Sequence, residues 1–440
     1  MSHVFHRGPG HVLPLASRAR GSTIWDADGK RYLDAAGGAI VVGIGHGDQA
    51  VVDAIREQSI RIAYAHATQF TAEALERYAD ELTPLLPMDD PHVYPVSGGS
   101  EAVETALKLA RAYHLARGEP SRHKIIARWG SYHGNTLAAL DASGREPLRR
   151  PYEPWLGRFL HLPAAYEYRC PIGSHPRGCG EEHARLLDET IRREGPGTVA
   201  AFVAEPVVGA TLGAAVPPDG YWPAIERVCR EHGVLLIVDE VMTGFGRTGR
   251  WFASEHWNVH PDVLVAGKGA SSGYWPLGLT VCSGEVFRTV SASPFVHGFT
   301  YSHHVVGAAV GLAVLERLRE GDLVEASREK GERLLGALRE ALADDPHAGD
   351  VRGLGLMIGI ELVRDGQTKA PFAREERVTE RVVAAARERG VLLYPSTGCA
   401  NGTDGDIVML GPPFVITDDE LSVAIEITAQ AIGALEHAAV

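Results

Sequence analysis

Two short apolar runs of the chain each end in a charged residue that could do chemistry. Residues 233–238 lead to Asp239, and residues 263–267 lead to Lys268. Continuous apolar runs of this length are typical of strands buried on both faces of a parallel sheet, whose ligands bind outside the carboxyl ends of the strands. An acid beside a desolvated lysine suits a pyridine-aldehyde cofactor. The lysine holds the aldehyde as a Schiff base, and the acid keeps the ring nitrogen protonated.

A glycine-rich turn before a helix predicts a phosphate site. The apolar run at 92–96 is followed by Gly98, Gly99 and Ser100, where a strongly helical segment opens. Glycines let the backbone approach a ligand closely, Ser100 is a natural N-cap, and the free amides of a helix N-terminus bind phosphate. Many such turns bind no ligand. This turn indicates a phosphate site only if other residues suited to the same ligand lie near it.

Further residues supply those partners. Tyr132 follows the run at 124–129 and could stack on a planar cofactor, and Glu205 follows the run at 199–204 as a second acid. Thr300 lies in a hydroxyl-bearing loop suited to a phosphate. Each has an ordinary alternative, as packing filler, solvated charge or loop hydroxyl. The convergence carries the prediction, because separate predicted strands of one sheet bring five such residues to the same edge: Ser100, Tyr132, Glu205, Asp239 and Lys268.

The order of apolar runs and helical stretches predicts an α/β fold. From about residue 91 to residue 284 the two alternate, with the clearest helices at 100–117, 181–193 and 221–232. This order predicts βαβ crossovers and a mostly parallel sheet that helices cover on both faces. After residue 300, long helical patterns alternate with short apolar runs, which predicts a smaller α+β lobe.

The two ends of the chain are predicted to belong outside the large sheet. Residues 1–20 should form an arm, and residues 23–34 a hairpin turning at Asp-Ala-Asp-Gly. Strands of the smaller lobe are expected at 351–362, 391–394 and 406–409. We therefore divide the chain into three parts: 1–60, the arm with part of the small lobe; 61–310, the large cofactor-binding domain; and 311–440, the small α+β domain.

Composition narrows the class of protein. The 440 residues carry a formal net charge of -13, which argues against a nucleic-acid partner and against an anionic membrane surface. The N-terminus lacks the apolar core of a signal peptide, and no run approaches the roughly 20 apolar residues that span a bilayer. These features predict a cytoplasmic protein.

The cysteines indicate a reducing compartment. There are five, an odd number in a long chain. Cys170 and Cys179 bracket a loop rich in proline and glycine. A metal site there would need a second pair of ligands, and the sequence offers none at tight spacing. We expect a surface loop with free thiols, and no metal.

Taken together, these motifs make the chain similar to the class III pyridoxal-phosphate-dependent aminotransferases of fold type I. The resemblance runs from residues 25–34 to residues 411–414 and so covers nearly the whole chain. It implies pyridoxal 5′-phosphate as cofactor. Its most specific pieces lie at 99–102, 132–134, 205–207, 239–249 and 266–269.

The resemblance implies a role for each residue around the cofactor ring. Lys268 would carry the Schiff base, and Asp239 would pair with the pyridinium nitrogen. Val241 would pack on one face of the ring and Tyr132 on the other, with His133 also among the cofactor-binding residues.

The remaining implied roles concern the phosphate and the substrate. Gly99 and Ser100 would hold the phosphate, and Glu205 would lie near the substrate side of the ring. Thr300 would reach the phosphate bound by a neighbouring subunit, which implies a homodimer or a dimer of dimers. The implied reaction is a two-half ping-pong transamination between a small-molecule amine and a keto acid, with Lys268 as the proton carrier.

Three positions depart from the family pattern and bear on the substrate. His303 stands where relatives often have Gly. Met409 and Gly402 stand where relatives place an arginine for a substrate carboxylate. We therefore predict an amine or ω-amino acid donor and a small keto acid, pyruvate favoured, with a partly apolar pocket mouth that includes Ile40, Phe70 and Trp275.

Other functions stay open on the sequence alone. An amino-acid epimerase or decarboxylase would share the cofactor, and a glutamate or 2-oxoglutarate-using aminotransferase would share the reaction. A regulator that kept the fold but lost catalysis is less favoured, because Lys268, Asp239 and Glu205 are all present and no basic DNA-binding segment is attached. A generic α/β binding protein is the remaining alternative.

Overall fold

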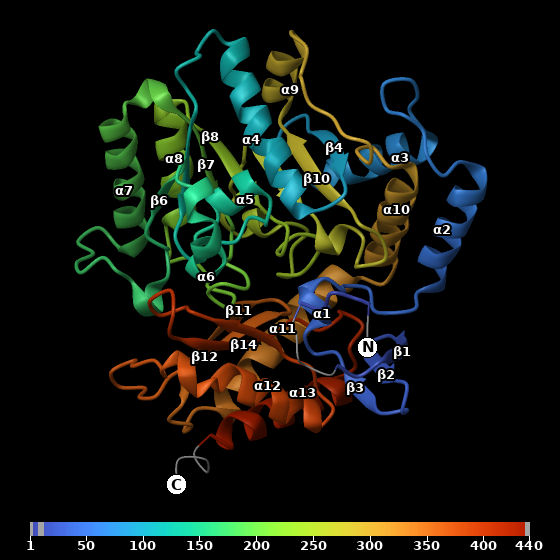
Figure 1. The fold of residues 1–440 in the computed structure, drawn as a ribbon, viewed down its shortest axis with the longest axis vertical. Coiled ribbons are helices and arrows are strands. Elements are labelled where there is room, and N and C mark those ends of the chain that lie inside the picture. Colours follow the sequence, from blue (N-terminus) through green and yellow to red (C-terminus); the bar gives the residue numbers. More distant parts are fainter. Residues whose placement is uncertain (1–2, 8–12, 436–440) are drawn as a thin grey trace.

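A seven-stranded sheet forms the centre of the computed structural model, which describes residues 3–7 and 13–435 (Figure 1). Its strand order is β4-β10-β9-β8-β7-β5-β6. Every described pairing is parallel except those of β10, which runs antiparallel to β4 and β9. The prediction of a mostly parallel sheet is confirmed. The strands are β4 His92–Val96, β5 Lys124–Arg128, β6 Leu160–Leu162, β7 Val199–Ala204, β8 Leu235–Asp239, β9 Val263–Ala266 and β10 Gly278–Cys282.

Helices cover both faces of this sheet because its inner strands are apolar on both sides. In β8, Leu235 and Ile237 join the core cluster that packs under α4, and Leu236 and Val238 join the cluster under α7 and α8. Alternate residues of a strand point to opposite faces, so a continuous apolar run must be covered twice. The helices of this region are α4 Gly99–Ala116, α5 Leu137–Ala142, α6 Glu146–Arg149, α7 Cys179–Glu194, α8 Tyr221–His232 and α9 Gly284–Ser291.

The C-terminal region forms its own sheet in the order β11-β12-β14-β13, antiparallel throughout. Three helices lie with it, in orange and red below the large sheet in Figure 1. The elements of this region are α11 Leu323–Ala341, β11 Ala348–Leu354, β12 Met357–Leu362, α12 Val378–Glu388, β13 Tyr394–Thr397, β14 Asp406–Leu410 and α13 Asp418–Gly433. The preceding helix, α10 Val305–Glu320, packs instead against α2 Gln49–Arg61 and α3 Glu73–Leu82.

The N-terminal segments lie beside this C-terminal region. A small antiparallel sheet, β1-β2-β3, meets it where Leu33 N donates to Gly390 O at 2.8 Å and Leu392 N donates to Leu33 O at 2.9 Å. Figure 1 shows this blue sheet next to the red end of the chain. The elements beside the C-terminal region are β1 Ala16–Arg20, β2 Thr23–Asp26, β3 Arg31–Leu33 and α1 Gly37–Ile40, and the chain then continues into α2 and α3, which lie against α10 (Figure 1).

Most predicted elements are found, and the differences have local causes. The hairpin at 23–34 is confirmed. The predicted arm contains β1, and its residues 1–2 and 8–12 lie outside the described part of the chain. The single run predicted at 351–362 is two strands, because the chain reverses at Gly355, whose φ is 53°. The strand predicted at 391–394 begins only at its last residue. The three-part domain division stays a prediction.

Arg247 ties these regions together just beyond the end of β8. Its guanidinium donates to Leu356 O at 3.0 Å, to Pro412 O at 2.7 Å and to Val42 O at 3.0 Å. It is 3% exposed, and burial lowers its pKa to about 9. Three carbonyl groups from segments far apart in the sequence thus bind one buried cation. These contacts hold the three segments in place beneath the ends of the strands. None of the helices in the described ranges is both long and apolar enough to cross a membrane.

Candidate active site

A cavity of 310 Å³ opens at the carboxyl ends of the parallel strands. Its wall comes from the residues that follow β4, β5, β7, β8 and β9, which is the edge where the sequence predicted a ligand site. Eight of the nine predicted site residues line it: Gly99, Ser100, Tyr132, His133, Glu205, Asp239, Val241 and Lys268.

Lys268 enters the cavity from the turn after β9. Its backbone has φ 41°, in the left-handed region that a lysine rarely adopts, and its Nζ donates to Ala39 O at 3.1 Å. Burial lowers the pKa of Lys268 to about 8, while the carboxylates of Glu205 and Asp239 act in the opposite direction. A lysine with this pKa is partly neutral near physiological pH, so its amine can act as a nucleophile and a base.

Asp239 ends β8 as a buried, oriented carboxylate. It is 3% exposed. Its Oδ2 accepts a hydrogen bond from His133 Nδ1 at 2.7 Å, and its Oδ1 accepts from Val241 N at 3.0 Å. His133 is also buried, and its Nε2 has no hydrogen-bond partner among the described residues. Two strand ends therefore fix the carboxylate in one orientation, and one imidazole nitrogen beside it is left unpaired.

Glu205 is the second buried acid at this edge. Its Oε1 accepts from Tyr132 N at 3.0 Å, and its Oε2 accepts from Gly209 N at 2.8 Å. Burial raises the pKa of Glu205, so it holds its proton to a higher pH than an ordinary glutamate. The acid joins the loop after β5 to the loop after β7. A Cβ at Gly209 would lie 2.5 Å from Met242 Sδ and 3.2 Å from Glu205 Oε2, so this turn packs closely against both side chains.

The N-terminus of α4 presents its first backbone amides to the cavity. Gly98 is the N-cap, with extended backbone and no side-chain cap, so the prediction of Ser100 as N-cap is wrong. The Ser100 hydroxyl instead donates to Asn135 Oδ1 at 3.1 Å and accepts from Asn135 N at 3.1 Å. A Cβ at Gly99 would lie 3.0 Å from Val241 Cγ1, so glycine lets this helix end approach β8.

The remaining walls are partly apolar. Tyr132, which is 39% exposed, and Trp275 both line the cavity. Two other residues predicted at the mouth lie elsewhere. Ile40 is 1% exposed and packs in a core cluster, and Phe70 is 67% exposed and outside the lining. Isolated aromatic and aliphatic residues in a sequence do not show which face they will occupy, so this part of the prediction was wrong.

Comparison with known proteins decides the family. The profile of the family described as Aminotransferase class-III matches residues 4–432. The chain belongs to the class III aminotransferases. Members of this family move an amino group between small amines and keto acids, and this chain is an enzyme of that kind. The aminotransferase predicted from the sequence, and its fold, are confirmed.

Three relatives illustrate how closely this aminotransferase follows known ones. An (S)-enantioselective omega-transaminase from Thermomicrobium roseum has 39% identity and a TM-score of 0.91, with 98% of this chain and 96% of that chain covered. An omega transaminase from Pseudomonas jessenii in complex with PMP has 30% identity and a TM-score of 0.91, with 98% and 97% covered. Putrescine–pyruvate aminotransferase of Pseudomonas aeruginosa has 33% identity, with 92% and 88% covered.

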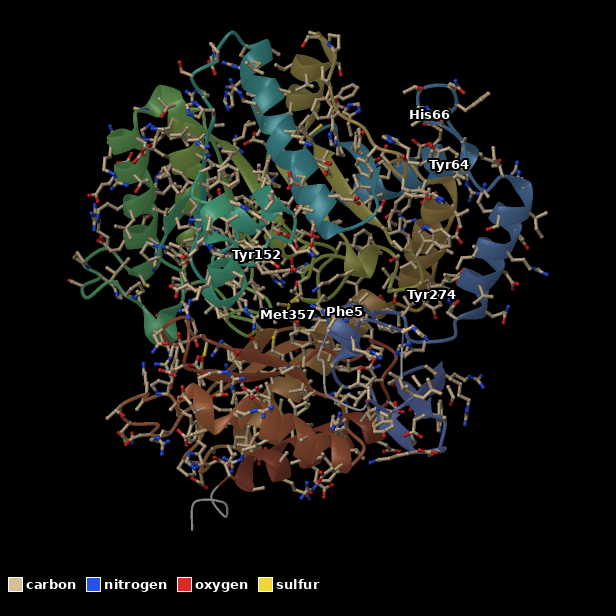
Figure 2. The ribbon with its side chains drawn as sticks, viewed as in Figure 1. Phe5, Tyr64, His66, Tyr152, Tyr274 and Met357 are labelled. Atoms are coloured by element: carbon tan, nitrogen blue, oxygen red, sulfur yellow. The ribbon has the colours of Figure 1, made fainter. Side chains whose placement is uncertain are left out.

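Thr300 is the one predicted site residue that lies outside the cavity of this aminotransferase. It is exposed and lines a second hollow beside Tyr64 and His66, which Figure 2 shows on the segment beyond α2. Nearby His303 has φ 58°, a left-handed backbone conformation that glycine adopts most easily. The histidine accepts a left-handed backbone whose cost is about 1–2 kcal/mol.

Arg145 is a charged residue near Tyr132, outside the cavity lining, that the sequence analysis missed. It lines a hollow bounded by residues 397–402, on the side of Tyr132. Its Nη2 reaches Ser396 Oγ at 3.5 Å, and its Nε has no hydrogen-bond partner among the described residues. Burial lowers the pKa of Arg145. No motif marks it, because it is the residue just before the short helix α6 and only the fold brings it to β13.

The structure locates the two positions at which the resemblance led us to expect an arginine. Met409 is 0% exposed in β14, inside a core cluster. Gly402 lines the same hollow as Arg145, and a Cβ there would lie 2.4 Å from Glu146 Oε2. Neither position supplies a cation to this aminotransferase.

Proposed function

We propose that this chain binds pyridoxal 5′-phosphate and transfers an amino group from an amine or ω-amino acid to a small keto acid, with pyruvate favoured. One observation carries the proposal: Lys268, with its lowered pKa, shares a 310 Å³ cavity with the oriented carboxylate of Asp239. We assign the activity to the cytoplasm, because all five cysteines are free thiols and structural disulfides are rare in reducing compartments.

The donor set fits this cofactor. The first-turn amides of α4, beside Gly99 and Ser100, suit the phosphate. Val241 and Tyr132 suit the two faces of a planar ring. The unpaired Nε2 of His133 is a buried polar atom that a ring substituent or water could satisfy. The Pseudomonas jessenii relative in complex with PMP also supports the assignment.

Each chemical task then falls to a residue of this chain. When bound, pyridoxal phosphate supplies an electrophilic aldehyde carbon and a protonated ring that withdraws electrons. Asp239, held by His133 and the Val241 amide, keeps the proton on the ring nitrogen. Lys268 would hold the cofactor at rest, and once the donor amine had displaced it, the freed Nζ would take a proton from the donor carbon and deliver it to the former aldehyde carbon. Glu205 fixes the loop that carries Tyr132.

The charge on Asp239 can be tested by substitution. We expect Asp239→Asn to slow the single-turnover proton shift with an amine by roughly 10- to 150-fold, the equivalent of about 1.5–3 kcal/mol, because an amide cannot stabilise a pyridinium. Stopped-flow absorbance measures the rate. Glu240→Gln is the matched control, since Glu240 is a buried neighbouring carboxylate that faces Thr243, Ala253 and Ser254 instead of the cavity. Equal rates for Asp239→Asn and the unsubstituted enzyme would assign the ring nitrogen to another group.

The homodimer is proposed from the place of Thr300. This threonine is exposed and absent from the lining of its own chain's cavity. Exposed apolar residues surround it, with Val296 93% and Tyr301 60% exposed. Apolar surface of this kind marks interfaces. A second copy that covered it would bring Thr300 toward the phosphate site of the partner.

Mixed dimers test whether Thr300 acts across the interface. A dimer of one Lys268→Ala chain and one Thr300→Ala chain should contain one complete site, because the intact Lys268 receives Thr300 from the other chain. We expect that site to bind the cofactor as tightly as the unsubstituted enzyme, and the Thr300→Ala homodimer to bind it about tenfold more weakly. Fluorescence titration of differently tagged, copurified chains measures this. Weak binding in the mixed dimer, or an active monomer in sedimentation, contradicts the proposal.

The substrate proposal rests on how many cations the site offers to carboxylates. Arg145 is half-buried and has an unpaired Nε, so it can bind the single carboxylate of pyruvate. Arg169 lines the same hollow but is already paired with Glu361. Met409 and Gly402 leave the second carboxylate of 2-oxoglutarate without the arginine that relatives provide. The putrescine–pyruvate aminotransferase relative points in the same direction.

Acceptor kinetics test this proposal. With a diamine such as putrescine as donor, we expect kcat/KM for pyruvate to equal or exceed that for 2-oxoglutarate. Arg145→Ala should raise the KM for pyruvate by about 10-fold or more and leave the half-reaction with the carboxylate-free donor unchanged. Arg150→Ala, an exposed neighbour, is the control. A tenfold preference for 2-oxoglutarate, about 1.4 kcal/mol, means that another cation binds the second carboxylate.

A further inference from the structure

A cluster of cysteine and histidine side chains lies away from the active site, on the segment that enters α7. Cys170, His175, Cys179 and His183 follow one another with the spacing C-x4-H-x3-C-x3-H. Cys179 is the first residue of α7, and His183 lies four residues later, on the same face of the helix. The sequence analysis looked for a second pair of ligands beside the two cysteines and overlooked these histidines, because their spacing is irregular.

The ligand atoms of Cys170, His175 and Cys179 converge, and His183 approaches Cys170. Cys170 Sγ lies 3.6 Å from Cys179 Sγ, 3.2 Å from His175 Nε2 and 3.6 Å from His183 Nε2. The ligand atoms of Cys170, His175 and Cys179 all lie within 4.8 Å of one another. Both thiols are free.

The separations from Cys170 Sγ are close to those of a tetrahedral metal site, although His175 Nε2, at 3.2 Å, lies nearer than the ideal distance. Bond lengths of about 2.3 Å to sulfur and about 2.0–2.1 Å to nitrogen place two sulfurs about 3.8 Å apart, and a sulfur and a nitrogen about 3.6 Å apart. A disulfide would bring the two sulfurs to about 2.05 Å. The observed Sγ–Sγ distance therefore fits two ligands of one ion.

We propose that Cys170, His175 and Cys179 bind a zinc ion, and that His183, 3.6 Å from Cys170 Sγ, turns toward the ion as its fourth ligand. Two thiolates and two imidazoles form a soft, closed donor set typical of structural zinc. His175 is exposed and gives an ion access, while His183 is 3% exposed and sits against the ring of Tyr221. The candidate ion position therefore has one solvent-facing side and one side anchored in the core.

The surrounding contacts are those expected of a rigid loop. Arg177, between His175 and Cys179, pairs with the buried Glu182 at 3.1 Å. Gly178 has φ 93°, which lets the chain turn directly into α7. The loop is thus closed on the first turn of the helix before any ion is considered, so a bound ion would add little conformational cost.

The zinc site would act as a structural clamp between the two regions of the molecule. Arg169, the residue before Cys170, pairs with Glu361 of β12 in the C-terminal sheet. Arg169 also lines the hollow that contains Arg145. An ion that fixes Cys170 would fix this contact, and with it one wall beside the active site.

Metal analysis of the purified holoenzyme tests the proposal. Chains produced in zinc-supplemented medium and purified without chelator should contain about one zinc per chain by plasma mass spectrometry. His175→Ala and Cys179→Ala should each lower the zinc content at least tenfold, with unchanged circular dichroism. His260→Ala, an exposed histidine outside the cluster, should keep it. Because His175 is exposed, its variant removes a ligand without opening the core.

A second readout separates zinc binding from other fates of the thiols. The cobalt-substituted enzyme should show a thiolate-to-cobalt charge-transfer band that Cys179→Ala lacks. Metal-free protein with two free thiols, or with a Cys170–Cys179 disulfide detected by mass, overturns the proposal. So does zinc that is retained in both ligand variants.

Discussion

The hydrogen bond between His133 and Asp239 is the interaction on which the site depends most. A buried carboxylate without donors costs several kcal/mol, so the chain must bring donors to it. The donors are His133 Nδ1, from the loop after β5, and Val241 N, from the turn after β8. Satisfying this one group therefore fixes two strand-end loops relative to each other. Glu205 repeats the arrangement with the amides of Tyr132 and Gly209.

Lys268 lies in the field of these two acids. Burial disfavours its charged form, and the two acids favour that form, with burial dominant. The burial that removes the apolar strands from water thus also lowers the pKa of the Lys268 amine. The floor below is held by Arg247, whose three backbone contacts join the N-terminal segment and the C-terminal sheet to the end of β8. Buried charged groups therefore both hold the segments of the fold together and set the properties of the site.

Sequence patterns were sufficient where a local rule decides the structure. The apolar run of β8 required a doubly covered strand, and that strand placed Asp239 at the ligand edge. They were insufficient where contacts are long-range. His133 and Asp239 are separated by 106 positions. Arg145 approaches Ser396 only after both lobes have folded. No periodicity or capping rule encodes such pairs.

Two further differences come from competition between local groups. Ser100 was expected to cap α4, but Gly98 reaches the extended cap conformation and frees the hydroxyl for Asn135. The cysteine loop was expected to hold thiols alone. His175 of the loop approaches Cys170, and so does His183, which α7 places on the same face as Cys179. In both cases the sequence shows which residue types are present, but it does not show how their side chains are arranged in space.

The most direct test of the account asks which lysine holds the cofactor. The purified enzyme would be incubated with pyridoxal 5′-phosphate, reduced with borohydride, digested and mapped by mass spectrometry. The account predicts about one phosphopyridoxyl group per chain, on the peptide that contains Lys268, and none on that peptide in Lys268→Arg. A label on a different lysine of the unsubstituted enzyme, or unchanged labelling of Lys268→Arg, would contradict it.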